Sequence, residues 1–165
     1  GYSNLGISMV FNDVLARYEI NRAKVNAFDG SGLSHENRIS TETLAQVLLK
    51  MINNPKFAPA INGLPVGGIS GTLQRRFINS APQAVGLVHA KTGSISGVVS
   101  LAGYIESGPH KYVFAIIADR IGRNYYAESA ARAKIDKLLG KIAYPLEIAT
   151  APEITPTPSP ETITS

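Results

Sequence analysis

Residues 88–97 hold the pattern best suited to chemistry in this sequence, the triplet Lys91, Thr92 and Gly93 between two apolar segments typical of β-strands. On a strand at the edge of a sheet, an ammonium group, a hydroxyl group and bare backbone N–H groups can face the same carboxylate and carbonyl of a ligand. The glycine matters because a side chain there would hold the ligand away from the backbone. By itself the triplet is a weak signal, because Lys-Thr-Gly also arises by chance.

A second polar segment, residues 29–40, contains Ser34 and Asn37 three positions apart. Its Asp-Gly and Ser-Gly pairs are typical of turns, and Asn37 or Ser40 could cap a helix that begins near Thr41. A capping loop and a catalytic loop are both consistent with this segment alone. The two segments together say more. A Ser-x-x-Asn loop followed about fifty residues later by Lys-Thr-Gly on a strand matches two motifs of the serine acyl-transferases that recognise penicillin.

Three segments in this order resemble the C-terminal part of the low-molecular-mass penicillin-binding proteins, in particular the D-alanyl-D-alanine carboxypeptidase/endopeptidase group (peptidase family S13). Residues 29–37 contain Gly-Ser-Gly-Leu-Ser-x-x-Asn, residues 67–77 contain Gly-Thr-Leu-x-x-Arg-Phe, and residues 89–105 contain Lys-Thr-Gly-Ser and then Leu-Ala-Gly-Tyr. The similarity extends over residues 27–140. It implies the C-terminal part of a β-lactamase/transpeptidase-like domain.

One motif of that family is missing from the sequence. No serine is followed three positions later by a lysine, whereas the family's nucleophile lies in a Ser-x-x-Lys element far upstream of the Ser/Asn loop. The sequence also begins at Gly1 without an initiator methionine. We therefore expect a C-terminal portion of a longer protein, whose N-terminal remainder is its partner.

The resemblance implies catalytic roles for Ser34, Asn37 and Lys91. Ser34 would pass a proton to the departing D-alanine nitrogen, because a hydroxyl group can accept and donate at once. Asn37 would hold both the substrate amide and the loop. Lys91 would lie behind Ser34, where its charge favours the proton relay and attracts the terminal carboxylate of the peptide. The alternatives are a turn hydroxyl at Ser34 and a plain surface lysine at Lys91.

The resemblance also implies that Thr92, Gly93 and Ser94 bind the substrate. The Thr92 hydroxyl would donate to the terminal carboxylate, and Gly93 would let the strand approach the ligand. The backbone N–H of Ser94 would be one of two donors to the oxyanion that forms during acyl transfer. The other donor would belong to the absent nucleophile element.

The composition is that of an ordinary globular domain, with 44% apolar residues and a net charge of +4. We expect no cofactor and no metal, because cysteine is absent and the three histidines lack metal-ligand spacing. Basic residues are scattered without interleaved aromatic residues, which argues against a nucleic-acid partner. No apolar stretch approaches the roughly 18 residues of a membrane span.

Hydrophobic spacing predicts helices at residues 7–18, 41–52 and 125–142, and antiparallel strands at residues 86–94, 98–106 and 111–119. A short helix is expected at residues 72–78 within a segment rich in Gly and Pro. In the first long helix Met9, Val10, Val14 and Leu15 share a face. In the last one the residues expected to point inward are Ala131, Ile135, Leu138 and Leu139.

This order of elements predicts an α+β fold in which an antiparallel sheet packs against helices. Residues 1–146 would form the C-terminal portion of a transpeptidase-like, penicillin-binding domain. Residues 147–165 are rich in Pro, Thr and Ser and are expected to form a tail that packs no core.

We therefore expect part of a serine DD-carboxypeptidase/DD-endopeptidase that cleaves D-Ala-containing peptidoglycan peptides through an acyl-enzyme and is inhibited by β-lactams. The expected partners are peptidoglycan stem peptides and β-lactam antibiotics, and the expected location is the periplasm or the cell exterior. One alternative is a non-catalytic peptidoglycan-binding relic of the same fold. Another is a serine β-lactamase, although the Gly-Ser-Gly-Leu-Ser and Leu-Ala-Gly-Tyr segments look like the carboxypeptidase group.

Overall fold

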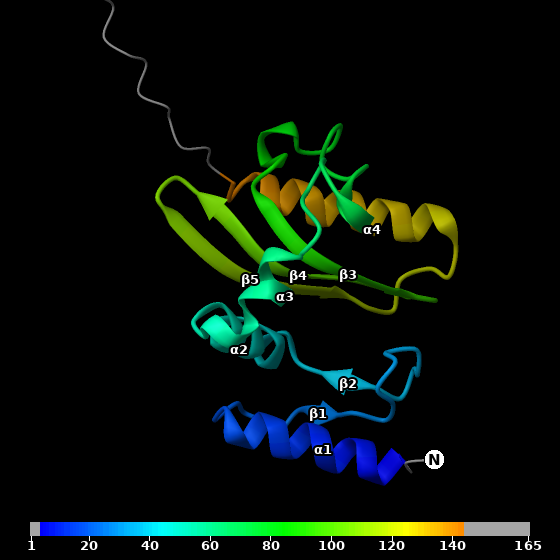
Figure 1. Cartoon of the computed structure of the whole chain (residues 1–165). Coiled ribbons are helices and arrows are strands. Elements are labelled where there is room, and N and C mark those ends of the chain that lie inside the picture. The colour runs from blue at the N-terminus through cyan, green and yellow to red at the C-terminus, as the bar shows by residue number, and fades with distance from the viewer. Residues whose placement is uncertain (1–3, 144–165) are drawn as a thin grey trace, which may run out of the picture.

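The computed structural model describes residues 4–143 (Figure 1). The expected tail and the domain boundary at residue 146 lie outside these residues. Within the described residues, four α-helices and five strands follow one another along the chain in this order: α1 (Asn4–Arg17), β1 (Val25–Asn26), β2 (Arg38–Ile39), α2 (Thr41–Ile52), α3 (Ala58–Asn62), β3 (Val88–Ile95), β4 (Val98–Ser107), β5 (His110–Ala118) and α4 (Tyr125–Gly140).

The centre of the fold is an antiparallel sheet with the strand order β3–β4–β5. The turn between β3 and β4 contains Gly97 at φ +81°, a backbone conformation that glycine adopts without a steric penalty. Side chains alternate between the two faces of the sheet. Val88 and Ala90 therefore share one face with Ile105, whereas Lys91 lies on the other.

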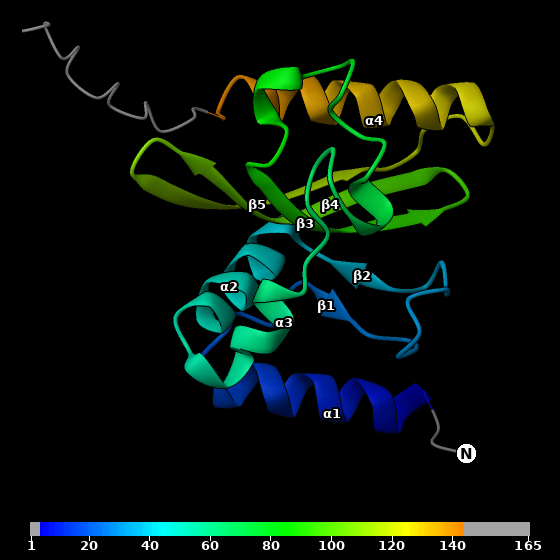
Figure 2. The same cartoon turned by 45° about the horizontal axis from the view of Figure 1, so that its top comes forward.

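Helix α4 covers the first of these faces (Figure 2). Leu139, Ile135 and Ala131 of α4 belong to one buried cluster with apolar residues of β3 and β4. Phe77, from the segment that precedes β3, is 1% exposed in the same cluster. The main hydrophobic core thus lies between the sheet and α4.

The opposite face of the sheet meets α2, which contacts β5 most extensively. The short β1–β2 pair lies beside α2 and α3 on the same side of the sheet, and α1 lies farthest from the sheet (Figure 2). Helix α2 begins where Ser40 caps it, because the Ser40 Oγ accepts a hydrogen bond from the Thr43 N–H at 3.1 Å.

The three longer predicted helices and the three predicted strands are confirmed, with ends shifted by a few residues. The predicted helix at residues 72–78 is wrong, because only a 3₁₀ turn, Gly71–Leu73, forms there and Phe77 adopts φ +71°. Leu138 does not point inward and is 50% exposed. Met9 and Val10 of α1 are 64% and 61% exposed, since no described element packs on that side. None of the described helices is long and apolar enough to cross a membrane.

Candidate active site

The loop between β1 and β2 is organised by the carboxylate of Asp29. Its oxygens accept hydrogen bonds from the backbone N–H groups of Gly32 and Ser34, both at 2.7 Å, and from the Ser31 hydroxyl at 3.2 Å. Gly32 adopts φ +77°, which lets the chain turn back toward the carboxylate. The Ser34 Oγ in turn accepts a hydrogen bond from the Glu36 N–H at 3.0 Å.

Asn37 closes the same loop from its other end. Its side-chain nitrogen donates to Asp29 Oδ1 at 2.9 Å, and its oxygen accepts from the backbone N–H groups of Phe28 at 2.8 Å and Asp29 at 3.2 Å. The hydrogen bond from Asn37 is the main cause that lowers the pKa of the Asp29 carboxyl. The expected role of Asn37 in holding the loop therefore has a structural basis, and its role toward a substrate stays a prediction.

Lys91 lies on β3, on the sheet face that α2 also covers. Its Nζ donates to the carbonyl oxygen of Thr92 at 2.8 Å, and its side chain is otherwise exposed. Helix α4 packs on the opposite face of the sheet, and the β1–β2 pair lies on the same side of the sheet as α2 (Figure 2). Lys91 therefore lies on the sheet face that is turned toward the β1–β2 pair.

The outer edge of β3 is covered only along its first half. There the Gly67 N–H donates to the Val88 carbonyl at 2.8 Å and the Ala90 N–H donates to the Pro65 carbonyl at 2.9 Å. Backbone groups alternate along a strand, so the N–H groups of Thr92 and Ser94 point to this outer edge as well. In the described part of the chain no backbone group pairs with them there.

The side chains of Thr92 and Ser94 lie on the α4 side of the strand. Thr92 Oγ1 donates to Thr72 Oγ1 at 3.0 Å. Ser94 Oγ accepts a hydrogen bond from Arg132 Nη2 at 3.0 Å, and Arg132 also pairs with Glu128 at 3.0 Å. The Ser94 side chain therefore anchors the end of β3 to α4, while its backbone N–H remains at the open edge.

Close packing against β4 is a second reason for glycine at position 93, in addition to the expected approach of a ligand to the strand. It pairs with Ser100 across the β3–β4 ladder, and a Cβ atom at position 93 would overlap the Ser100 Oγ. A side chain there would force the Ser100 hydroxyl to move even without a ligand.

The loop and the strand lie at the same end of the molecule. In both views the β1–β2 loop is on the side where β3 ends (Figures 1 and 2). Among residues 4–143, no hydrogen bond or ion pair joins Ser34 or Asn37 to Lys91. The structure thus groups Lys91, Thr92, Gly93 and Ser94 on one strand and Ser34 and Asn37 on one loop, and the proton relay between the two groups stays a prediction.

Sequence reasoning missed three residues that shape this region. The Asp-Gly pair at Asp29 predicts only a turn, although an Asp-Gly pair followed by serines is typical of a side chain that organises its own loop. Arg132 and Glu128 carry no sequence signal for their contact with Ser94, because 38 and 34 residues separate them from it.

His89 lies on the same sheet face as Lys91, and its ring stacks on that of Tyr104 with the centroids 4.5 Å apart. Burial is the main cause that lowers the pKa of His89, because it penalises the charged imidazolium. Among the described residues no group of three His, Cys, Asp or Glu side chains could hold a metal ion. The region offers a cation, hydroxyl groups and open backbone donors, which suit a ligand with a carboxylate and a carbonyl.

Comparison with known proteins gives a consistent result. The sequence model of the D-Ala-D-Ala carboxypeptidase 3 (S13) family matches residues 3–142. The penicillin-sensitive carboxypeptidase A of Dictyostelium discoideum is 43% identical over 100 residues, which are 55% of this chain and 19% of that protein. The D-alanyl-D-alanine carboxypeptidase DacB of Haemophilus influenzae is 38% identical over 79 residues, 48% of this chain and 16% of that protein. The chain thus spans about a fifth of the length of these relatives.

A solved structure shares the fold. The penicillin-binding protein 4 (dacB) of Haemophilus influenzae, solved in complex with a β-lactam, superimposes with a TM-score of 0.72 and 26% identity. The match covers 86% of this chain and 34% of that one. The expected β-lactamase/transpeptidase-like fold is confirmed.

Proposed function

Because this chain belongs to the D-Ala-D-Ala carboxypeptidase 3 (S13) family, we propose that it is the C-terminal part of a serine DD-carboxypeptidase/DD-endopeptidase. Its substrates are D-Ala-containing stem peptides of peptidoglycan, its inhibitors are β-lactams, and it acts in the periplasm or outside the cell. The observation that carries the proposal is the open outer edge of β3. There Lys91 and the backbone N–H groups of Thr92 and Ser94 gather within four residues.

The residues supply part of what acyl transfer requires. The Lys91 ammonium group attracts the terminal carboxylate of the peptide, and the Thr92 hydroxyl turns from Thr72 to donate a hydrogen bond to this carboxylate. The Ser94 N–H donates to the oxyanion that forms when a serine oxygen attacks the peptide carbonyl. As the amide C–N bond breaks, the Ser34 hydroxyl passes the proton released by the attacking serine to the departing nitrogen, which leaves as free D-alanine. Water then hydrolyses the serine ester and frees the enzyme.

The nucleophile is the part of the machinery that this sequence lacks. None of its serines has a lysine three positions later. We assign the nucleophile to the N-terminal remainder of the same protein. The short share of the relatives that this chain spans supports that assignment.

The missing motif also favours a second candidate, a non-catalytic protein that keeps the peptide-binding edge of β3 but performs no acyl transfer. The two differ in one feature of the gene, which is an in-frame Ser-x-x-Lys upstream of Gly1. A serine β-lactamase has less support, because the matching family and relatives are carboxypeptidases.

Covalent labelling by fluorescent penicillin tests the proposal on the protein extended to include its upstream region. We expect the extended protein to be labelled. Lys91→Ala should slow the labelling by about a hundredfold or more, the usual scale for a lost group in proton transfer. Lys111→Ala is the matched control, because Lys111 lies on the same sheet face with its Nζ 4.3 Å from the Tyr104 ring centroid.

Three results would contradict the proposal. Equal labelling of the Lys91→Ala and Lys111→Ala proteins would remove Lys91 from the mechanism. Covalent labelling of the 165-residue chain alone would place the nucleophile inside it. An upstream region without Ser-x-x-Lys would leave only the non-catalytic candidate.

A further inference from the structure

The hydroxyl group of Ser94 lies between two charged side chains of α4. Arg132 Nη2 donates a hydrogen bond to the Ser94 Oγ at 3.0 Å, and the Ser94 hydroxyl donates to Glu128 Oε2 at 3.5 Å. The same Arg132 Nη2 donates to Glu128 Oε2 at 3.0 Å, which closes a triangle of hydrogen bonds. Because the Ser94 hydroxyl both accepts and donates within the protein, the direction of its side chain is fixed from α4.

The end of β3 has few other supports. Backbone pairing along the outer edge of the strand ends at Ala90. Within the described chain, the hydrogen bonds that reach residues 92–95 from outside the β3–β4 hairpin come from one hydroxyl group, which pairs with Thr92, and from the two α4 side chains at Ser94. The orientation of Ser94 toward the open edge therefore depends on α4.

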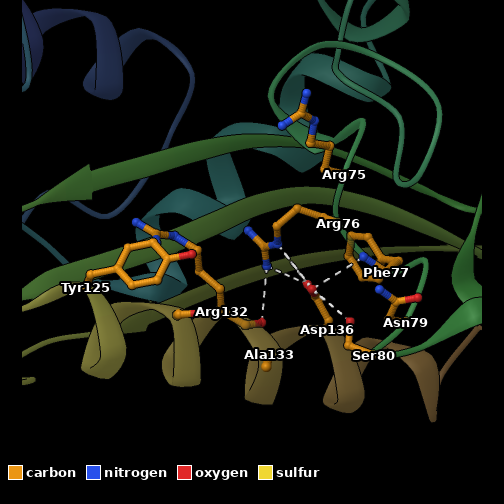
Figure 3. Close-up of a pocket in the computed structure, with 10 residues that line it drawn as sticks. Arg75, Arg76, Phe77, Asn79, Ser80, Tyr125, Arg132, Ala133 and Asp136 are labelled. Carbon is orange, nitrogen blue, oxygen red and sulfur yellow. Dashed lines mark hydrogen bonds and ion pairs between the residues drawn. The ribbon is translucent and has the colours of Figure 1, made fainter.

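Helix α4 is itself held in place at the turn that carries Arg132. Arg76 Nη2 donates to the Arg132 carbonyl at 3.3 Å, and Arg76 Nε donates to the carboxylate of Asp136, one turn further along α4, at 3.1 Å (Figure 3). The Arg76 and Asp136 side chains are 12% and 5% exposed. The Arg132 side chain thus extends to Ser94 from a fixed point of the helix.

The charge of Arg132 is neutralised by its neighbour. Arg132 and Glu128 are four residues apart on α4, and their side chains are only 30% and 21% exposed. A guanidinium group that is already paired with a carboxylate attracts a second carboxylate weakly, because the two charges largely cancel at a distance. The pair is therefore better suited to hold Ser94 than to bind an anionic substrate.

We propose that Arg132, oriented by Glu128, is a positioning residue that keeps the backbone N–H of Ser94 aimed at the oxyanion formed during acyl transfer. This inference rests on the proposed function, in which that N–H is an oxyanion donor. Arg132 does not touch the substrate and acts through the Ser94 hydroxyl. A donor stabilises the oxyanion only when it lies about 2.7–3.1 Å from that oxygen, and a displacement of about 1 Å can slow a reaction about a hundredfold.

The kinetics of acylation by fluorescent penicillin test this role on the protein extended to include its upstream region. The dependence of the rate on penicillin concentration separates noncovalent affinity from the acylation rate constant. Arg132→Ala should lower the acylation rate constant about tenfold, less than the loss of about a hundredfold for a missing oxyanion donor. The noncovalent affinity should stay unchanged, because the oxyanion exists only after attack on the carbonyl.

Arg17→Ala is the matched control. Arg17 forms the corresponding ion pair on α1, with Asp13 four residues away and a distance of 3.0 Å between Arg17 Nη2 and Asp13 Oδ2. Its replacement should change neither the acylation rate constant nor the noncovalent affinity.

Ser94→Ala removes the hydroxyl group through which Arg132 acts and keeps the backbone N–H. It should lower the acylation rate constant by about the same factor as Arg132→Ala, and the double variant should be no slower than the slower single one. Ser94→Ala deletes one exposed oxygen atom, and the β3–β4 turn stays tied to the segment before α4 by the hydrogen bond from the Ile121 N–H to the Gly97 carbonyl at 3.2 Å. This variant should therefore fold even where Arg132→Ala does not.

Four results would overturn the proposal. Arg132→Ala could acylate as fast as Arg17→Ala, or Ser94→Ala as fast as the unchanged protein. Weaker noncovalent affinity with an unchanged acylation rate constant would make Arg132 a ligand of the penicillin carboxylate. Losses that multiply in the double variant would show that Arg132 does not act through Ser94. Failure of the proposed function is distinguishable, because the unchanged extended protein would then not be labelled at all.

Discussion

Replacement of Asp136 by alanine tests how strongly one buried ion pair holds α4 to the segment before β3. The Asp136 and Arg76 side chains are 5% and 12% exposed. Without the carboxylate, the Arg76 guanidinium keeps one hydrogen bond, from its Nη2 to the Arg132 carbonyl at 3.3 Å, and its position over the Phe77 ring. The Phe77 N–H also loses its acceptor, at a residue with φ +71°.

The expected loss follows from these contacts. Removing one partner of a buried ion pair lowers the free energy of unfolding by about 3–5 kcal/mol, because the remaining charge stays buried without a partner. Domains have unfolding free energies of about 5–15 kcal/mol, so the variant should lose a large share of its stability. Asp13→Ala is the matched control, since Asp13 pairs with Arg17 on the exposed side of α1. Its cost should be about 0.5 kcal/mol.

Urea unfolding followed by circular dichroism measures both variants. The double replacement Arg76→Met/Asp136→Leu completes the experiment, because exchanging a buried pair for apolar side chains is often neutral. We expect it to be more stable than Asp136→Ala. The reasoning would be refuted if Asp136→Ala cost no more than Asp13→Ala, or if the double variant were no more stable than Asp136→Ala.

Three further predictions concern the sheet and the loop. Because burial lowers the pKa of His89 in the folded chain below 6.5, the unfolded chain binds a proton at His89 more readily, and stability should fall as the pH drops from 6.5 toward the lowered pKa. Thermal unfolding of His89→Phe at pH 7.5 and pH 5 should show a smaller loss of stability than that of the unchanged protein. Asn37→Ala should raise the pKa of Asp29 toward 3.8 in an NMR titration, and an unchanged pKa would contradict the hydrogen-bond assignment. Gly103→Ala should cost about 3 kcal/mol or more in urea unfolding, because its Cβ would overlap the His89 carbonyl oxygen. Gly30→Ala, with open space around it, should cost at most about 0.5 kcal/mol, and equal costs would contradict the overlap.

The candidate site was predictable where its residues are close in sequence. The Lys-Thr-Gly triplet needed only one strand, and alternation along that strand places Lys91 on one face and Thr92 on the other. The role of Asn37 within its loop was also predictable, since Asn37 and Asp29 are eight residues apart. The distance between the β1–β2 loop and β3 could not be predicted from the sequence, because it depends on how α2 and the β1–β2 pair pack on that side of the sheet.

The sequence by itself determined the local elements, the turns and caps between them, and the order of motifs that marks the family. Ser40 and Gly97 act within a few residues of their own positions, so their effects can be read from the chain. Tertiary structure alone decided which faces of the helices and strands are covered, because hydrophobic spacing identifies an apolar face but not the element that packs against it. It left Met9 exposed, and it brought Arg76 to Asp136 across sixty residues of chain. Such pairs form only when the sheet and α4 pack together, because burial then forces each charge to find a partner.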